Sequence, residues 1–354
     1  MRKSKNMNLP RVDELDVFGQ KVLLRMDVDV PVEDGKVLDD TRLRASIPTI
    51  KYLIEEGAES IVVLGHRGRP GGKTVQELSL SPVAKHLEKL LEKEIGKKKL
   101  HEFEIQMAEN LRFMKGEESF DSADTLGQQD KAIGESFVQD LAVNGDVYIN
   151  DAFAASNREH ASIVGLPEIL PSAAGFSVIH EVESLEKILK DPKKPVVAVL
   201  GGGKVDKAVF IPKFLEIADW VLVGGLLAKH AASYCTENER GGVCVVGAHL
   251  TPQGHDINPD SAKNFVEIIK SANTIVWGGP MGDIDGGFWD GTKVVGSAIG
   301  ESRAFKVAGG GDTIHAINEL GIQDKFDHIS TGGGAMLEFL AYGDLPGLRA
   351  LRGE

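Results

Sequence analysis

Two stretches, KVLLRMDVDVP at Lys21–Pro31 and PVVAVLGGGK at Pro195–Lys204, decide the fold class of this chain. The apolar runs within them are Lys21–Val30 and Pro195–Leu200, and each is followed by proline or glycine. Such continuous runs are typical of strands that helices cover on both faces. Similar runs recur at Ser60–Leu64, Asp146–Asn150, Trp220–Val223, Thr274–Trp277, Phe305–Ala308 and His328–Ser330.

Amphipathic segments lie between these runs and predict helices. They are Arg42–Glu56, Ser81–Glu94, Lys131–Val143, Ala208–Ile217, Ser261–Ser271 and Thr313–Leu320. Strands that alternate with helices predict an α/β fold with mainly parallel sheets. The mid-chain segment Ser177–Asp191 also has apolar residues at helical spacing. We expect this segment to be a rigid helix that joins two α/β halves.

Length, composition and charge narrow the class of protein further. At 354 residues the prior is two domains, and a hydrophobic content of 42% supplies ample core. A formal net charge of −13 argues against binding to nucleic acid or to anionic lipid. The two cysteines form neither a disulfide framework nor a zinc set, and we find no signal peptide or membrane-length apolar run. A cytoplasmic protein is expected.

The standard nucleotide-binding patterns are absent. The opening G-x-G of the dinucleotide fingerprint occurs at Gly201, Gly309 and Gly332, but no glycine stands where the pattern ends. A loop that ends like a Walker A motif at residues 72–74 lacks its first glycine. A dehydrogenase is therefore disfavoured.

Basic residues stand where strands of the first half meet turns. They are Arg25, Arg42, His66, Arg67, Arg69, Arg112 and Arg158. Ligands of open α/β sheets bind outside the carboxyl ends of strands, so convergent arginines there predict an anionic ligand. The alternative is that each arginine pairs with a surface carboxylate. Asp27 and Asp29 are expected to share a strand face with Arg25, either in a structural network or to orient a substrate hydroxyl or an arginine.

The second half carries three triple-glycine turns, at residues 201–203, 309–311 and 332–334. Glycine-rich turns at helix N-termini expose backbone N–H groups to phosphate, although a single cluster is more often only a tight turn. Asp312 is a candidate Mg²⁺ ligand, and Lys204 or Lys207 could neutralise phosphate charge. Neither half has a Ser-His-Asp or Cys-His set, whereas phosphoryl transfer needs mainly positioning, Mg²⁺ and positive charge.

The sequence resembles the phosphoglycerate kinase family. The strings that carry the resemblance occur in the family's order from about Val12 to Leu351: LLRMDVDVP, DDTRLRASIPTIKYL, GHRGRP, SLSPVAKHL, ENLRF, DVYINDAFAASNREHAS, LPSAAGF, IVWGGPMG, AGGGDT, HISTGGGAMLEFL and DLPGL. The resemblance implies an α/β fold of two Rossmann-like three-layer domains joined by a helix. It also implies reversible transfer between 1,3-bisphosphoglycerate and ADP, giving 3-phosphoglycerate and MgATP, by hinge closure of a monomer.

The resemblance also implies domain limits and a site. The triose-phosphate domain would span 1–176, the helix 177–191, the nucleotide domain 192–340, and a tail at 341–354 would return to the first domain. The implied triose-site residues are Asp27, Asp29, Arg42, His66, Arg69, Arg112 and Arg158, with Arg42 nearest the transferred phosphoryl group. The implied nucleotide-site residues are Gly202, Gly203, Lys204, Lys207, Gly278, Asp285, Gly310, Gly311, Asp312, Thr313, Gly333 and Gly334. Arg42, Lys204 and Lys207 are the implied catalytic residues, and Asp312 the Mg²⁺-linked carboxylate.

The chain departs from the family pattern mainly in the nucleotide half. Lys207 follows Lys204 by three residues instead of four, which on an α-helix is a rotation of about 100°. Gly278 replaces an asparagine that usually helps bind phosphate, and the shorter Asp285 stands where a ribose-binding glutamate is usual. Residues 234–256 replace a much longer segment. In the triose half, Asp29 replaces an asparagine and adds negative charge beside an anionic substrate.

Three functions follow from these observations. The first is an active Mg²⁺-dependent kinase that uses ATP or ADP. The second is a noncatalytic or altered-specificity binding protein on the same fold, motivated by Gly278 and Lys207. The third, a dehydrogenase, is weakened by the missing fingerprint. No nucleic-acid or membrane partner is expected.

Overall fold

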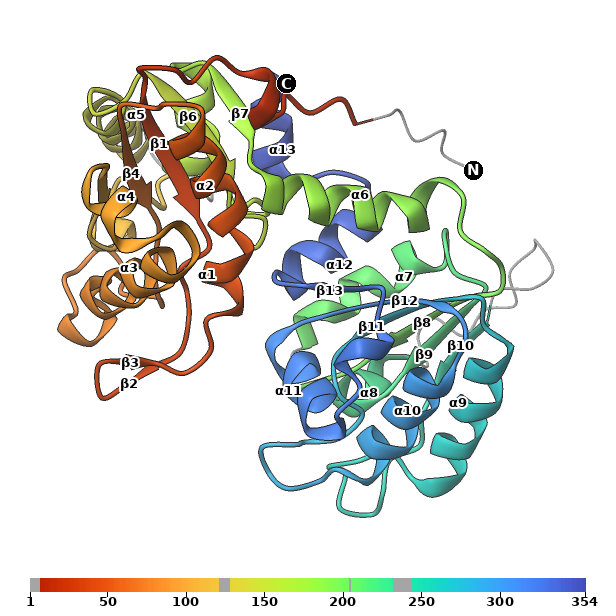
Figure 1. Ribbon diagram of the computed structural model, residues 1–354. Coiled ribbons are helices and arrows are strands. Elements are labelled where there is room, and N and C mark those ends of the chain that lie inside the picture. Colours follow the sequence, from red (N-terminus) through yellow and green to blue (C-terminus); the bar gives the residue numbers. More distant parts are fainter. Residues whose placement is uncertain (1–6, 121–127, 204, 232–243) are drawn as a thin grey trace. The chain divides into compact units, whose positions relative to one another are not determined.

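A computed structural model describes residues 7–120, 128–203, 205–231 and 244–354 of the chain (Figure 1). The chain divides into two compact units, and each is described by itself. The N-terminal unit comprises residues 7–182 and 344–354, and the C-terminal unit comprises residues 183–343. The boundary falls within helix α6 (Phe176–Lys190), which corresponds closely to the helix predicted at mid-chain. The domain limits expected from the sequence stay a prediction.

A five-stranded parallel sheet of order β5-β4-β1-β6-β7 forms the centre of the N-terminal unit. Its strands are β1 (Lys21–Met26), β4 (Ser60–Leu64), β5 (Glu104–Met107), β6 (Val147–Asp151) and β7 (Ser172–Ala174). A separate antiparallel hairpin pairs β2 (Val32–Glu33) with β3 (Lys36–Val37). The helices of this unit are α1 (Thr41–Ala45), α2 (Ile47–Glu55), α3 (Ser81–Ile95), α4 (Lys97–His101), α5 (Gln128–Ala142), the start of α6, and α13 (Pro346–Leu351).

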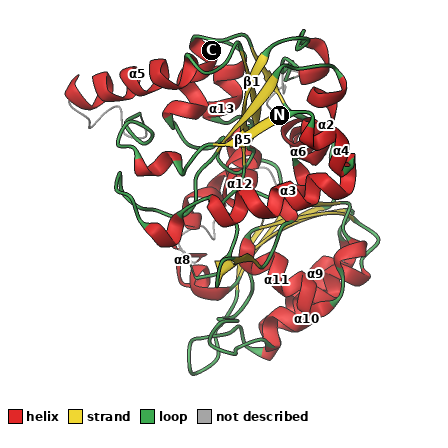
Figure 2. Cartoon of the chain, turned by 60° about the vertical axis from the view of Figure 1, so that its left-hand side comes forward, coloured by secondary structure: helices red, strands yellow, loops and turns green. Residues whose placement is uncertain are grey.

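The two faces of β1 differ in what they bury. Val22, Leu24 and Met26 pack with the apolar faces of α2 and α3 in one hydrophobic cluster. Leu23 and Arg25 are also fully buried, and alternation along the strand points them to the opposite face. Figure 2 shows α2 and α5 on opposite sides of this sheet, which gives the three layers of a doubly wound unit.

A six-stranded parallel sheet of order β10-β9-β8-β11-β12-β13 forms the centre of the C-terminal unit. Its strands are β8 (Val196–Leu200), β9 (Trp220–Val223), β10 (Cys244–Gly247), β11 (Thr274–Gly278), β12 (Phe305–Gly309) and β13 (His328–Ser330). Its helices are the end of α6, α7 (Ile211–Phe214), α8 (Ala228–Ala231), α9 (Pro259–Ser271), α10 (Asp290–Glu301), α11 (Gly311–Leu320) and α12 (Gly333–Tyr342). The core beneath α9, α10 and α11 includes Phe265, Trp277 and Ile299.

The parallel α/β class with two domains is confirmed, and several element limits are corrected. The helix expected at 42–56 is two helices, because Pro48 is tolerated only in the first turn and α2 therefore begins anew at Ile47. Pro212 has the same effect, and 208–217 is a 3₁₀ segment (Val205–Phe210) followed by α7. β1 ends at Met26, before Asp27. In the described part of the chain, no helix combines the length and apolar character needed to span a bilayer.

Candidate functional site

The carboxyl ends of β1, β4 and β6 meet at one edge of the N-terminal sheet because these three neighbouring strands are parallel. The chain leaves β1 at Asp27, leaves β4 at the turn 65–69, and leaves β6 at the turn 152–158. Most of the predicted triose-site residues lie in these three segments. Such an edge is where open α/β sheets bind ligands.

Asp27 and Asp29 lie past the end of β1, so the strand alternation expected to group them with Arg25 does not apply to them. The Oδ2 atom of Asp27 accepts a hydrogen bond of 2.6 Å from the backbone N–H of Ala154, after β6. Burial raises the pKa of this carboxyl, while the charge of Arg42 acts to lower it. Asp27 thus ties the exit of β1 to the turn after β6.

Asp29, the aspartate that replaces an asparagine of the family, is anchored to the turn after β4. Its Oδ1 atom accepts a hydrogen bond of 3.0 Å from the backbone N–H of Gly68. Its carbonyl oxygen accepts a hydrogen bond of 2.6 Å from Nη1 of Arg42, at the start of α1. The added negative charge therefore has a backbone N–H donor, and the neighbouring guanidinium contacts the backbone of the same residue.

The arginines at this edge divide into buried and exposed members. Arg112 is largely buried, with Nη1 donating to the carbonyl of Gly68 at 2.8 Å and Nε lying 2.9 Å from a carboxylate oxygen of Glu118. Arg69 and Arg158 are exposed, and neither guanidinium makes a hydrogen bond or ion pair among the described residues. Among the described residues, these two arginines therefore do not pair with a surface carboxylate. This favours the interpretation that they bind an anionic ligand over the interpretation that they are structural.

His66 is held in a defined state at the same edge. Its Nδ1 atom lies 2.7 Å from Nη2 of Arg25. A guanidinium only donates, so Nδ1 accepts and the ring proton of neutral His66 is on Nε2. Burial and then the charge of Arg25 hold the pKa of His66 well below its usual value. His66 is therefore a neutral ring with an Nε2–H donor.

Arg67, between His66 and Gly68, has a structural role. Its buried guanidinium donates to the carbonyls of Glu77 at 2.6 Å and Val30 at 3.2 Å. These contacts hold the loop that begins after β1 against the segment after β4. Arg67 was among the basic residues singled out from the sequence, and its donors are used within the fold.

The glycine turns converge at the carboxyl edge of the C-terminal sheet. They follow β8, β11, β12 and β13, which are neighbours in the sheet. Gly279 has a φ of +116°, and a Cβ there would overlap the carbonyl oxygen of Gly201. A Cβ on Gly333 would overlap the backbone nitrogen of Gly310. Backbone approaches backbone directly at this edge, which is the arrangement that presents N–H groups to phosphate.

Thr313 and Asp312 open helix α11 with different surroundings. Thr313 is buried, and its hydroxyl accepts a hydrogen bond of 2.8 Å from the backbone N–H of Gly279. Asp312 is exposed in the first turn of α11. An exposed carboxylate suits Mg²⁺, which keeps several waters and usually takes one or two carboxylates besides substrate phosphates. Gly311 is exposed, and a Cβ there would meet no heavy atom within 4 Å.

The shortened lysine motif is partly placed. Lys204 lies outside the described residues. Lys207 lies in the 3₁₀ segment Val205–Phe210 rather than on an α-helix, so one residue corresponds to a rotation of about 120° instead of 100°. Its Nζ atom lies 3.7 Å from the position that a Cβ on Gly202 would take. The ammonium group thus faces the first glycine turn despite the missing residue.

Gly278 and Asp285 are two positions at which the C-terminal half departs from the family pattern. A Cβ on Gly278 would lie 3.0 Å from the tip of Leu337. Asp285 is exposed within a turn capped by Asp283, and its side chain makes no hydrogen bond or ion pair among the described residues. The structure does not link Asp285 with the glycine turns. The predicted replacement segment at 234–256 is described only from Cys244 onward.

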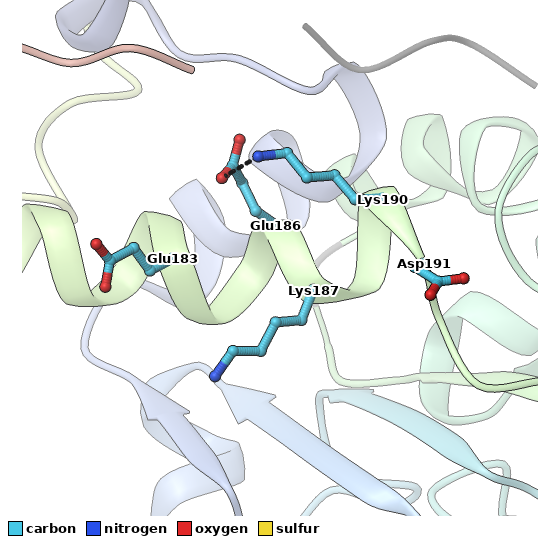
Figure 3. A pocket seen from close by; sticks show the side chains of 5 residues that line it. All are labelled: Glu183, Glu186, Lys187, Lys190 and Asp191. Carbon is cyan, nitrogen blue, oxygen red and sulfur yellow. Dashed lines mark hydrogen bonds and ion pairs between the residues drawn. The ribbon is translucent and has the colours of Figure 1, made fainter. Parts of the chain in front are cut away.

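Two further charged clusters lie away from these edges. Figure 3 shows a hollow along α6 whose lining side chains all come from Glu183, Glu186, Lys187, Lys190 and Asp191. Glu186 and Lys190 form an i,i+4 ion pair at 2.6 Å. Opposite charges on a single helix compensate each other here.

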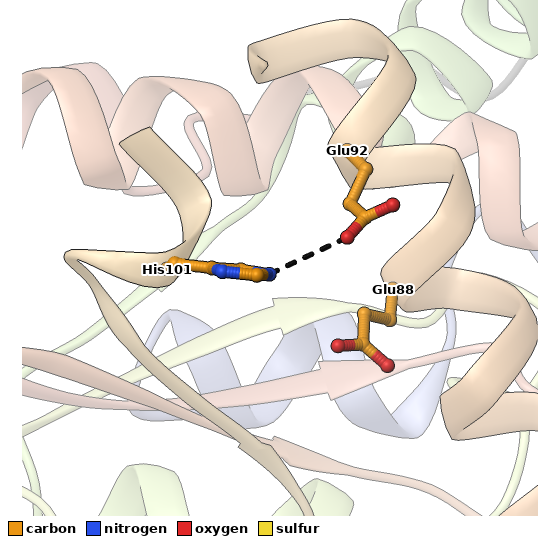
Figure 4. Close-up of side chains that lie close together, drawn as sticks. All are labelled: Glu88, Glu92 and His101. Atoms are coloured by element: carbon orange, nitrogen blue, oxygen red, sulfur yellow. Dashed lines mark ion pairs between the residues drawn. The ribbon is translucent and has the colours of Figure 1, made fainter. Parts of the chain in front are cut away.

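The second cluster joins α3 and α4 (Figure 4). The ligand atoms of Glu88, Glu92 and His101 lie within 4.8 Å of one another and could hold a metal ion. Glu92, however, already lies 3.4 Å from His101 Nε2 and 3.8 Å from Lys97 Nζ. Ion pairing accounts for this exposed group, and we assign it no metal.

Two parallel α/β units, one with an arginine-lined edge and one with a glycine-turn edge, define a class of two-domain α/β proteins. Residues 12–238 and 231–342 match the family described as phosphoglycerate kinase. The chain belongs to the phosphoglycerate kinase family.

Solved structures agree with this assignment. The phosphoglycerate kinase from Pyrococcus horikoshii OT3 is 31% identical, with a TM-score of 0.77 over 97% of this chain and 98% of that one. The phosphoglycerate kinase from Coxiella burnetii is 28% identical, with a TM-score of 0.76 over 98% and 99% of the two chains.

Two residues at these edges were not singled out from the sequence. Gly279 is one, although a pair of glycines directly after an apolar run is a usable signal for a turn with positive φ. Glu117 is the other. It stands in the polar string MKGEESF, which reads as a solvated loop, yet its side chain is fully buried.

Proposed function

We propose that this chain catalyses reversible phosphoryl transfer between 1,3-bisphosphoglycerate and ADP, with 3-phosphoglycerate and ATP as products. The observation that carries the proposal is the state of Arg69 and Arg158. In a protein of net charge −13, these two guanidinium groups have no acidic partner among the described residues and lie at the sheet edge where a ligand binds. An anionic triose supplies the missing partner by bidentate contacts.

The roles at the arginine edge follow from geometry and charge. Arg42 is the second residue of α1 and contacts the backbone of Asp29, which directs its guanidinium to this edge. We assign it to the charge that develops on the transferred phosphoryl group. His66 contributes an Nε2–H donor that carries no positive charge, because its pKa is held well below the usual value by burial and by Arg25.

The glycine edge supplies the nucleotide contacts of the proposal. Gly310 and Gly311 stand at the start of α11, where backbone N–H groups and the helix dipole both favour phosphate. Lys207 adds a positive charge beside Gly202. Asp312 would hold Mg²⁺, which when bound neutralises negative charge on the nucleotide phosphates.

Hinge closure is part of the proposal. Closing the two domains on their substrates excludes the water that would otherwise hydrolyse an acyl phosphate. We extend the proposal to a cytoplasmic monomer that uses these small molecules and neither nucleic acid nor a membrane. The acidic net charge of −13 supports the exclusion of nucleic acid.

A second candidate function is triose binding without catalysis. The exposed Asp285, which the structure does not link with the glycine turns, and Gly278, which has no side-chain amide, both favour it. Such a protein would bind 3-phosphoglycerate through the arginine edge and would show no ATP-dependent turnover.

A coupled assay separates the two functions. The purified chain is given 3-phosphoglycerate, MgATP and a reporting dehydrogenase, beside an Asp312→Ala variant, and 3-phosphoglycerate binding is measured by calorimetry. Turnover that is lost in Asp312→Ala supports the kinase. Binding of 3-phosphoglycerate without turnover over a wide range of ATP and GTP supports the second candidate. Absence of both overturns the proposal.

A further inference from the structure

A buried network of charged side chains lies beneath the arginine edge, on the face of β1 opposite the main hydrophobic core. Its members Arg25, Glu117, His160 and Ser162 are each fully buried. Glu117 is the acidic member of this set. Full burial of a carboxylate is costly unless it is paired and hydrogen-bonded, so its contacts decide what it does.

Glu117 is held by the π-helical turn Ala161–Gly165. Its Oε1 atom accepts a hydrogen bond of 2.7 Å from the hydroxyl of Ser162, and its Oε2 atom accepts one of 3.1 Å from the backbone N–H of the same residue. Its backbone carbonyl accepts a hydrogen bond of 2.8 Å from the N–H of Ala161. Turns of this kind are often found at functional sites.

The Glu117 carboxylate lies beside Arg25. The Nη2 atom of Arg25 lies 3.7 Å from Oε1 of Glu117, and Nε donates to the hydroxyl of Ser162 at 2.9 Å. The remaining donors go to the carbonyl of Met26, at 2.7 Å, and to Nδ1 of His66, also at 2.7 Å. The donors of Arg25 are therefore used within the fold. Because Arg25 contacts both Glu117 and His66, the position of the Glu117 carboxylate determines how the guanidinium is oriented toward His66.

Glu117 also faces the second histidine of the network. Nε2 of His160 lies 3.2 Å from Nη2 of Arg112, which can only donate, so the proton of a neutral His160 ring is on Nδ1. That Nδ1 atom lies 3.6 Å from Oε1 of Glu117. The rings of His66 and His160 meet edge to face, with centroids 5.4 Å apart. The two histidines thus have opposite tautomers, and each is fixed by an arginine.

We propose that Glu117 is a positioning residue of the triose site, which holds Arg25 and His160 in place and thereby fixes His66 as the Nε2–H tautomer. Among the described residues, Nε2 of His66 makes no hydrogen bond, so this N–H is left for a bound anion. The assignment rests on the proposed function for the identity of that anion. The tautomer of His66 is a property of the ligand-free protein and does not depend on it.

The test compares Glu117→Gln, Ser162→Ala and the exposed control Glu135→Gln on α5. Glu117→Gln keeps the shape of the side chain and removes its charge. Ser162→Ala removes the hydroxyl that bridges Glu117 and Arg25, and it carries the test if the first variant does not fold. The readouts are the imidazole ¹⁵N–¹H spectrum, assigned with a His66→Gln variant, the affinity for 3-phosphoglycerate by calorimetry, and thermal unfolding.

In the wild type we expect the His66 proton on Nε2 between pH 6 and 8. Glu117→Gln should populate the other tautomer and weaken 3-phosphoglycerate binding roughly 10- to 100-fold, the range for a lost hydrogen bond to a charged group. Ser162→Ala should shift both in the same direction by less, and Glu135→Gln should shift neither. A change in melting temperature alone indicates a purely structural carboxylate.

Wild-type tautomer and wild-type affinity in both folded variants would overturn the assignment. If the wild type itself does not bind 3-phosphoglycerate, the proposed function fails, but the spectrum still decides whether Glu117 fixes His66. The two failures are therefore distinguishable.

Discussion

The two sheet edges that we propose as anion-binding sites are built from different chemical groups. The edge of the N-terminal sheet uses side chains: guanidinium groups, a neutral histidine, and buried carboxylates such as Asp27 that tie the strand exits together. The edge of the C-terminal sheet uses backbone, with glycine packed directly on glycine at 201, 279, 310 and 333. Side chains supply full charges that pH and mutation can change, whereas backbone N–H groups supply partial charges whose geometry depends on the absence of a Cβ. The two edges should therefore fail in different ways.

The largest effect is expected from Arg42→Ala at the arginine edge. Loss of an arginine that stabilises a transferring phosphoryl group should lower kcat by roughly 10³-fold or more. The fold should remain intact, because Arg42 is only half-buried and its guanidinium contacts a backbone carbonyl of the site, that of Asp29, and not the hydrophobic core. Steady-state kinetics and circular dichroism measure the two outcomes.

Arg44→Ala is the matched control for this prediction. It removes an exposed arginine from the same short helix, where Arg44 pairs with Asp40 at 2.7 Å. Its kcat should stay near the wild-type value. Equal losses in both variants, or an unchanged kcat in Arg42→Ala, would show that Arg42 has no catalytic role.

The sequence predicts the strands of both sheets better than it predicts the helices that cover them. β4, β9 and β13 match their predicted limits. β4 and β9 consist almost entirely of apolar residues, which is typical of strands in a sheet covered on both faces, whereas β13 has a single apolar residue, Ile329. The short strand β7, of sequence Ser-Ala-Ala, has no large apolar residue and was missed. Its register is fixed by pairing with β6, which is a tertiary effect.

Helices α10 and α12 were missed for opposite reasons. α10 contains Gly291, Gly296 and Gly300, which lower helix propensity, and each is buried where a side chain would meet a neighbouring side chain. α12 is apolar on nearly all sides, so it shows no amphipathic contrast. Tertiary packing stabilises both helices, and a single sequence does not reveal it.

In the candidate site too, the sequence reveals residues that stand in motifs but not residues whose surroundings arise only in the folded chain. Arg42, His66 and Asp312 stand in motifs and were predicted from the sequence. Glu117 was not, because nothing in a polar loop string distinguishes a buried carboxylate from a solvated one. Its burial depends on Arg25 and Ser162, which are 92 and 45 residues away and meet it only in the folded chain.

The next effect, at the glycine edge, is expected from Gly333→Ala. The added methyl group would overlap the backbone of Gly310, and the turns after β12 and β13 must separate. Overpacking of this kind costs about 1–3 kcal/mol of stability. Nucleotide affinity should fall with it, because the N–H groups at the start of α11 are displaced. Chemical denaturation and ATP calorimetry measure both.

Gly311→Ala tests the same prediction from the other side. Its Cβ would meet no heavy atom within 4 Å, so the N–H stays in place and the helix should be no less stable. Its unfolding free energy should therefore be close to wild type. If Gly333→Ala is as stable as the wild type and binds ATP normally, direct packing of glycine on glycine is not what organises this edge.

Because the N-terminal edge is built from ionisable side chains, the stability of the chain should also depend on pH. Asp151, at the end of β6, is the residue for which we expect the clearest effect. Burial raises the pKa of Asp151 to about 7, although the N–H of Ser177 donates to its Oδ1 atom at 2.8 Å. The unfolded chain ionises this carboxyl near its ordinary pKa, so the native state binds the extra proton between about pH 4 and 7. Stability should therefore fall as pH rises through that window, by at most about 1.4 kcal/mol per pH unit.

Asp151→Asn should remove this part of the pH dependence. Unfolding free energies of the full chain, measured in denaturant from pH 4 to 8, provide the slope. Asp146→Asn, at an exposed position one residue before the same strand, is the control and should keep the wild-type slope. An unchanged slope in Asp151→Asn would mean that this carboxyl is ionised in the native state throughout the range.

The smallest effect is expected where the chain departs from its family within the arginine edge. Asp29→Asn keeps an oxygen that can accept the hydrogen bond from the N–H of Gly68, and it removes one negative charge beside the bound anion. At an exposed sheet edge that charge is worth about 1 kcal/mol or less, so 3-phosphoglycerate should bind up to about fivefold more tightly.

Asp34→Asn is the control for this prediction. It removes the same charge at the exposed hairpin between β2 and β3 and should leave the affinity unchanged. Calorimetry at low and high salt then sharpens the comparison of the two edges. A gain that disappears in salt identifies a charge effect, whereas weaker binding in Asp29→Asn would show that the carboxylate itself holds the turn after β4 in its binding geometry.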